Sequence, residues 1–177
     1  MLEKQPQLSD GVITLKQLST KDSEALFKMH SDKKMCKKAG LNIHHHIGET
    51  YLFIKNVGKK IRKRQFYYWG IFKDKVLVGV ISLWSVDHLK NSGELGYFIS
   101  SDYLRQGYMT RALKLVVNFL LSNSKLDKIQ AYIEEDNYAS KSLVKKLGFT
   151  LVNKTKEEAM SDDIMEMSVF EISKEIQ

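Results

Sequence analysis

Residues 105–110 join a polar turn to the start of a helix through Gly107, and this combination can bind a phosphate group. The first turn of a helix leaves backbone N–H groups without intrahelical partners, at the positive end of the helix dipole. Glycine has no side chain, so an anion can approach the backbone closely there. Strand–turn–helix units with a glycine also serve as plain connections, so this pattern alone leaves both interpretations open.

The elements that would position this turn are a strand before it and a helix after it. An apolar strand begins at Gly93, and the helix over residues 106–122 places its apolar side chains on one face, at Met109, Ala112, Leu113, Val116 and Leu120. A later helix begins after Asn137 or Asp136 as its N-cap and ends at Gly148.

Apolar alternation and aromatic or β-branched content predict further strands over 12–18, 66–72, 76–84, 129–133, 149–152 and 164–172. Helical spacing predicts helices over 20–30 and 49–64. We expect an irregular start over 1–10 and a polar loop over 154–163. The segment 76–84 is apolar on both faces, which is typical of a central strand covered on both sides.

The predicted order is β-α-α-β-β-β-α-β-α-β-β, an α/β or α+β layer fold. The chain has 177 residues, of which 43% are hydrophobic, so it can bury a core of its own. No repeat or linker divides it, and we therefore expect one domain over residues 1–177.

The chain shows no secretory signal and no apolar run of about 18 residues, so we expect a cytoplasmic protein that does not enter membranes. The single cysteine, Cys36, fits a reducing compartment. Cys36 is interpreted as an ordinary helix or loop residue among lysines, in preference to a nucleophile.

Adjacent histidines at 44–46 point in different directions and cannot all face one metal ion, so His44, His45 and His46 are interpreted as a loop, with a substrate-facing loop as the alternative.

Basic residues exceed acidic ones by 28 to 21, giving a net charge of +7, and they gather around 33–38, 59–64 and 141–146. Such clusters can attract a nucleic acid, an acidic protein or a polyanionic cofactor. A run of lysines on a helix is also often only a solvated face.

Two segments of the chain together resemble the GNAT superfamily of N-acetyltransferases, and within it the RimJ/RimL-like branch. The first reads Gly-Glu-Leu-Gly-Tyr-Phe-Ile-Ser from Gly93, followed by Arg-Gln-Gly-Tyr-Met-Thr-Arg-Ala-Leu from Arg105. The second reads Asn-Tyr-Ala-Ser-Lys-Ser-Leu-Val-Lys-Lys-Leu-Gly-Phe from Asn137. The resemblance implies an acyl-CoA N-acyltransferase fold, with a mixed, mostly antiparallel sheet splayed between its fourth and fifth strands and helices on both faces.

The resemblance also implies acetyl-CoA as co-substrate and no metal. Backbone N–H groups of the turn and helix start would bind the pyrophosphate, at Arg105, Gln106, Gly107, Tyr108, Met109 and Thr110. Leu104 and Met109 depart from the family pattern Gln/Arg-x-x-Gly-x-Gly/Ala at its first and last positions. The pantetheine arm would lie between the splayed strands, where Phe98 and Ile99 offer main-chain hydrogen bonds and Asn137 a side-chain one.

Acetyl transfer requires a neutral amine, yet an α-amino group has a pKa near 8 and a lysine near 10.4, so a proton must leave. By resemblance, Glu94 is the candidate base, acting directly or through water. Ser140, one helical turn after Asn137, is the candidate donor to the departing thiolate. The structural alternatives are an ion pair of Glu94 with Lys90 or Arg111, and a hydrogen bond of Ser140 to its own helix backbone.

For the acceptor, the resemblance implies a primary amine, first of all the N-terminal α-amine of a protein such as a ribosomal protein. The basic clusters would help the chain meet an acidic protein with a free N-terminus. A small-molecule amine, such as a polyamine or an aminoglycoside-like compound, is the alternative.

From another class, the chain could be a nucleic-acid-binding or protein-binding module without turnover. Its basic residues are not interleaved with aromatic ones, which disfavours nucleic acid. Segments 31–65, 85–92 and 154–163 are expected on the acceptor side, Tyr97, Tyr103 and Tyr108 near the cleft, and a homodimer through the terminal strands is left open.

Overall fold

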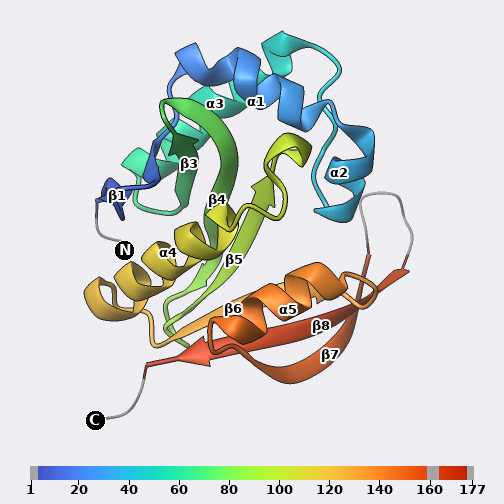
Figure 1. Ribbon diagram of the computed structural model, residues 1–177. Helices are drawn as coiled ribbons and strands as arrows, with labels where there is room; N and C mark the ends of the chain where they lie inside the picture. The colour runs from blue at the N-terminus through green and yellow to red at the C-terminus, as the bar shows by residue number, and fades with distance from the viewer. Residues whose placement is uncertain (1–3, 159–163, 175–177) are drawn as a thin grey trace.

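The computed structural model describes residues 4–158 and 164–174. In this part of the chain, eight strands form one sheet in the order β1-β2-β3-β4-β5-β6-β8-β7 (Figure 1). The strands are β1 (Leu8–Ser9), β2 (Thr14–Gln17), β3 (Tyr67–Lys73), β4 (Val76–Asp87), β5 (Ser92–Ile99), β6 (Lys128–Glu134), β7 (Thr150–Glu158) and β8 (Ile164–Ser173). Among the strands of the described residues, only β5 and β6 pair in parallel, which confirms the mixed, mostly antiparallel sheet.

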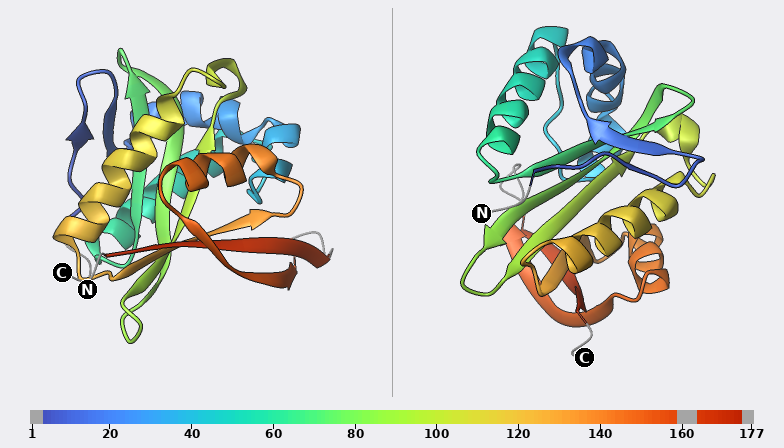
Figure 2. Two further views of the ribbon diagram at one scale, coloured as in Figure 1. Left: turned by 60° about the horizontal axis from the view of Figure 1, so that its bottom comes forward. Right: turned by 90° about the vertical axis from the view of Figure 1, so that its left-hand side faces the viewer.

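Helices cover both faces of this sheet, as predicted (Figure 2). They are α1 (Ser23–His30), α2 (Lys33–Lys38), α3 (Ile47–Arg62), α4 (Tyr108–Asn123) and α5 (Tyr138–Lys146), with short 3-10 turns η1 (Thr20–Asp22) and η2 (Ser101–Tyr103). Apolar residues of α4 and α5 pack with Leu95 on one face, whereas those of α1 and α3 pack with Phe98 on the other. Successive side chains of β5 therefore serve two separate cores.

The strands β5 and β6 pair over only three residues and then part. The pairs are Ser92–Lys128, Gly93–Ile129 and Glu94–Gln130. Beyond them β5 stays paired with β4 as far as Ile99, while β6 turns away along β8 (Figure 1). The predicted splay is confirmed, and it leaves main-chain groups of β5 facing a gap.

Two predictions of irregular structure were wrong. Leu8–Ser9 pairs with β2 through a turn that contains Asp10 and Gly11, and a strand of two residues is too short to show alternation. Residues 154–158, predicted as a loop, continue β7. The strand β7 is at the edge of the sheet, and its Lys154 and Lys156 are exposed there, where no apolar pattern is needed. The rest of that predicted loop, 159–163, lies outside the described residues.

The aromatic run of β3 is part of the core. Tyr67, Tyr68 and Trp69 are all buried. These rings cannot stack on the bases of a nucleic acid without unfolding the sheet. None of the helices in the described ranges has both the length and the apolar composition that crossing a membrane requires.

Candidate active site

The turn before α4 presents an open set of backbone donors. The φ angle is +59° at Arg105 and +80° at Gly107, which is the N-cap of the helix. A methyl group placed on Gly107 would meet nothing within 4 Å, so the space in front of the helix is open. The first return bond of the helix runs from Arg111 N to Gly107 O (3.1 Å), which leaves the N–H groups of the three preceding residues without intrahelical acceptors. This geometry fits a phosphate group.

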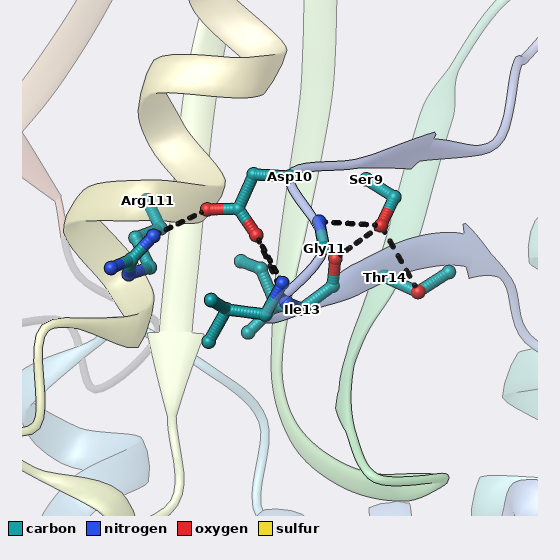
Figure 3. A network of polar contacts seen from close by, with 7 residues as sticks. Ser9, Asp10, Gly11, Ile13, Thr14 and Arg111 are labelled. Carbon is teal, nitrogen blue, oxygen red and sulfur yellow. Dashed lines mark hydrogen bonds and ion pairs between the residues drawn. The ribbon is translucent and has the colours of Figure 1, made fainter.

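The side chain of Arg111, in the first turn of α4, is held by the β1–β2 turn. Its Nη1 lies 2.8 Å from Oδ2 of Asp10 (Figure 3). The other carboxylate oxygen of Asp10 accepts hydrogen bonds from Val12 N (2.9 Å) and Ile13 N (3.0 Å). Burial acts to raise the pKa of Asp10, but the backbone N–H of Ile13 and the Arg111 guanidinium outweigh it and lower the pKa.

The two cations considered as partners of Glu94 each pair with another carboxylate. Arg111 pairs with Asp10, and Nζ of Lys90 lies 3.8 Å from Asp87. The half-buried Glu94 lies at the last rung before β5 and β6 part, opposite Trp84 on β4 and Gln130 on β6. The structure thus brings Glu94 to the mouth of the gap.

The N-terminus of α5 lies across the gap from β5 and is firmly anchored. Asn137 is its N-cap, because Oδ1 of Asn137 accepts a hydrogen bond from Ser140 N (3.1 Å). The amide NH2 of Asn137 is then the group that can donate to a ligand. Of the two capping candidates that the sequence offered, the structure uses Asn137.

A polar network around Glu135 fixes the chain just before α5. Lys141 and Lys154 each lie 2.8 Å from its carboxylate, and Ser168 donates a hydrogen bond to it. The hydrogen bonds of Lys141, Lys154 and Ser168 lower the pKa of Glu135 to about 2. The network ties β6, α5, β7 and β8 together, and so fixes where Ser140 lies.

Tyr97, expected near the cleft from the sequence and without a predicted chemical role, lies beside Ser140. Its hydroxyl is buried and has no hydrogen-bond partner of ordinary geometry among the described residues. Burial raises the pKa of Tyr97 to about 12, and the nearby Ser140 side chain opposes this shift. No local pattern could have signalled this pair, since its members lie on β5 and α5.

The two sides of the gap carry different chemistry. Glu94 and Tyr97 are three residues apart on one strand, so alternation directs their side chains to opposite faces. Glu94 shares the face of Phe98, under α1 and α3, and Tyr97 shares the face of α4 and α5. Glu94 and Ser140, the two predicted catalytic residues, therefore approach the gap from opposite sides. The side chain of Phe98 is buried, so only its main chain can face a ligand.

A buried histidine pair lies on the Glu94 side, against Phe98. The rings of His30 and His44 stack with centroids 4.4 Å apart, and Nδ1 of His44 lies 2.7 Å from Oγ1 of Thr50. Burial, and then His44, lower the pKa of His30 to about 4, against a weak opposing effect of the Asn42 backbone. Neither ring nitrogen of His30 has a hydrogen bond of ordinary geometry within the described ranges.

The histidine triplet separates in space, as its adjacency predicted. His44 is buried, the backbone N–H of His45 donates to Glu49 (2.9 Å), and His46 is the N-cap of α3. In residues 4–158 and 164–174, no three His, Cys, Asp or Glu side chains gather as metal ligands would. Cys36 lies in α2 and is buried, its Sγ lies 3.3 Å from the carbonyl oxygen of His30, and burial raises the pKa of its thiol, which disfavours a role as nucleophile.

Comparison with known proteins places this geometry among acetyltransferases. Residues 13–150 match the family described as acetyltransferase (GNAT) domain. The uncharacterized N-acetyltransferase YoaA of Bacillus subtilis (strain 168) is 27% identical over 146 residues, covering 81% of this chain and 82% of the relative. The ribosomal-protein-serine acetyltransferase of Escherichia coli (strain K12) is 28% identical over 81 residues, covering 46% of this chain and 45% of the relative.

Among solved structures, RimL, a ribosomal L7/L12 α-N-protein acetyltransferase in complex with coenzyme A, shares the fold. The TM-score is 0.85 at 16% identity, over 96% of this chain and 98% of that chain.

Proposed function

Because the chain belongs to the acetyltransferase (GNAT) domain family and is thus an N-acetyltransferase acting on an amine, we propose that its acceptor is the N-terminal α-amine of a protein. The observation that carries the site assignment is the parting of β5 and β6 after Glu94, next to the open N-terminus of α4. An elongated ligand with an anionic end fits this combination of gap and anion-binding turn.

The residues that would hold acetyl-CoA follow from this arrangement. Backbone N–H groups of residues 105–110 would bind the pyrophosphate, the main chain of β5 at Phe98 and Ile99 would pair with the pantetheine amides, and the amide of Asn137 would donate to them. When bound, acetyl-CoA supplies the acetyl group as a thioester. No metal is needed for this chemistry.

Two residues, Glu94 and Ser140, have separate roles in proton removal and in charge stabilisation. Glu94, on the α1 and α3 face, accepts the proton of the amine directly or through a water. Ser140, on the α5 face, donates a hydrogen bond to the sulfur as negative charge develops there. Their positions on opposite faces suit an amine and a thioester that approach each other through the gap.

The acceptor class is supported by the named relatives and by charge. A ribosomal-protein-serine acetyltransferase is similar to part of the chain, and an L7/L12 α-N-protein acetyltransferase shares its fold. The basic clusters on α2 and α3 belong to the segment expected on the acceptor side, and they would attract an acidic protein.

The test is a mass-spectrometric assay with acetyl-CoA and peptide acceptors. An acidic peptide with a free N-terminal serine should gain one acetyl group at its α-amine, and the same peptide with a blocked N-terminus but an internal lysine should not. Acetylation of the lysine, or of spermidine or an aminoglycoside in preference to the peptide, would overturn the proposed acceptor.

A further inference from the structure

The hydroxyl of Tyr97 is a buried donor that the fold leaves without a partner. Its oxygen is buried, and among residues 4–158 and 164–174 no group forms a hydrogen bond of ordinary geometry with it. A buried polar group in this state destabilises the folded protein, and a phenylalanine would fill the same space without that cost. Its presence therefore points to a role in the activity of the protein and not in its stability.

The position of Tyr97 in the fold indicates what this role is. Tyr97 lies on β5 opposite Ile81 of β4, three residues past the rung where β6 departs. Its ring packs with the core under α4 and α5, and its hydroxyl lies close to the side chain of Ser140. Both residues are held in place, since β5 is paired with β4 here and the first turn of α5 is capped by Asn137.

We infer that Tyr97 is a positioning residue for acetyl transfer, which donates a hydrogen bond to Oγ of Ser140 and thereby directs the Ser140 hydroxyl toward the leaving sulfur. The inference rests on the proposed function. A serine hydroxyl can accept one hydrogen bond while it donates another. A hydrogen bond from Tyr97 to Ser140 can therefore strengthen the hydrogen bond from Ser140 to the sulfur, although Tyr97 does not contact the sulfur.

In the acetyl-transfer step, each bond and each proton can be accounted for. The amine nitrogen bonds to the acetyl carbon, the carbon–sulfur bond breaks, and its electron pair stays on sulfur as a thiolate. The amine proton passes to Glu94 or to water. Tyr97 keeps its own proton throughout, because its pKa of about 12 lies far above working pH, so it stabilises charge as a donor and is not the acid.

The first test needs no acceptor. The thiol of bound coenzyme A is titrated through the ultraviolet absorbance of its thiolate, in the wild-type protein and in Tyr97→Phe. Loss of the donor should raise the bound thiol pKa by about 0.5 to 1. Tyr67→Phe removes the hydroxyl of a tyrosine buried in the same core, away from the gap, and should leave the thiol pKa unchanged.

The second test is kinetic and uses the serine peptide of the acceptor assay. Tyr97→Phe should lower kcat about 5- to 20-fold with the KM for acetyl-CoA unchanged within about twofold. In a Ser140→Ala background, Tyr97→Phe should lower kcat almost no further, because the hydroxyl through which Tyr97 acts on the sulfur is then absent. Thermal unfolding of Tyr97→Phe without ligand should occur at the same or a higher temperature than wild type.

The outcomes separate the two proposals. An equal thiol pKa in wild type and Tyr97→Phe, or additive losses of kcat in the double variant, would overturn the role of Tyr97 while the acetyltransferase assignment stands. Failure to bind coenzyme A would overturn both the cofactor assignment and the inference. A peptide that is not acetylated overturns the acceptor alone, since the thiol titration does not depend on it.

Discussion

Asp10 and Arg111 join the first hairpin to the N-terminus of α4, with 2.8 Å between Oδ2 and Nη1. A cation in the first turn of a helix is disfavoured by the helix dipole, and the carboxylate of Asp10 compensates it. The same carboxylate orders its own turn through two backbone N–H groups (Figure 3). A two-residue edge strand thereby supports the helix that begins at the proposed anion site.

Replacing Asp10 with Asn should lower the melting temperature slightly, by about 1 to 3 °C, because the amide keeps a turn acceptor but loses the charge. Arg111→Gln should have a similar effect, and the double variant little more. Because the folded-state pKa of Asp10 is lowered, its contribution is complete above pH 3.8 and is lost as the pH falls below that value. Scanning calorimetry at two salt concentrations checks this, and a loss equally large in high salt would contradict an ionic origin.

Gly107→Glu should weaken acetyl-CoA binding by about 100-fold or more, because it places a carboxylate against the backbone donors intended for phosphate. Its matched control is Gly107→Asn, since asparagine tolerates the positive φ of +80° and adds no charge. Calorimetric titration measures both variants. Equal binding by Gly107→Glu and wild type would exclude this turn as the pyrophosphate site.

Glu94→Gln should reduce kcat about 100-fold or more while the KM for acetyl-CoA stays unchanged, because the variant keeps the shape of the side chain and loses the base. The exposed Glu24 on α1 provides the control, as Glu24→Gln. Steady-state kinetics and a melting curve are needed together. A variant that melts earlier but turns over at the normal rate would assign Glu94 a structural role.

Stability should fall between about pH 6.5 and pH 4 through His30. Its folded-state pKa is lowered to about 4 from 6.5, so the unfolded chain binds a proton first as the pH drops. The contribution of neutral His30 to the free energy of unfolding is thus complete above pH 6.5 and is lost toward pH 4. The loss amounts to about 2 to 3 kcal/mol. Urea unfolding across this range should show the loss in wild type and much less of it in His30→Leu. An unchanged pH dependence in the variant would assign it to other groups.

Most of the helices and strands could be predicted because their signals are local. Helical spacing, strand alternation and caps act over a few residues, so the helices α1, α3, α4 and α5, the central strand β4 and the turn at Gly107 were predictable, and the cap of α5 was narrowed to Asn137 or Asp136. The resemblance to the GNAT superfamily predicted two further features, the family itself and the splay of β5 from β6. The short strand β1 and the polar end of β7 were missed because strands at a solvent-exposed edge need no apolar pattern.

Contacts between residues far apart in the sequence could not be predicted in this way. Tyr97 lies beside Ser140 because β6 departs from β5 and α5 packs over the gap, and His30 stacks on His44 because α1 and the start of α3 cover one face of the sheet. Strand alternation predicts the face of the sheet on which Glu94 lies. It does not predict which residues surround Glu94 on that face. Such contacts depend on how whole layers pack, and no local preference of the chain encodes them.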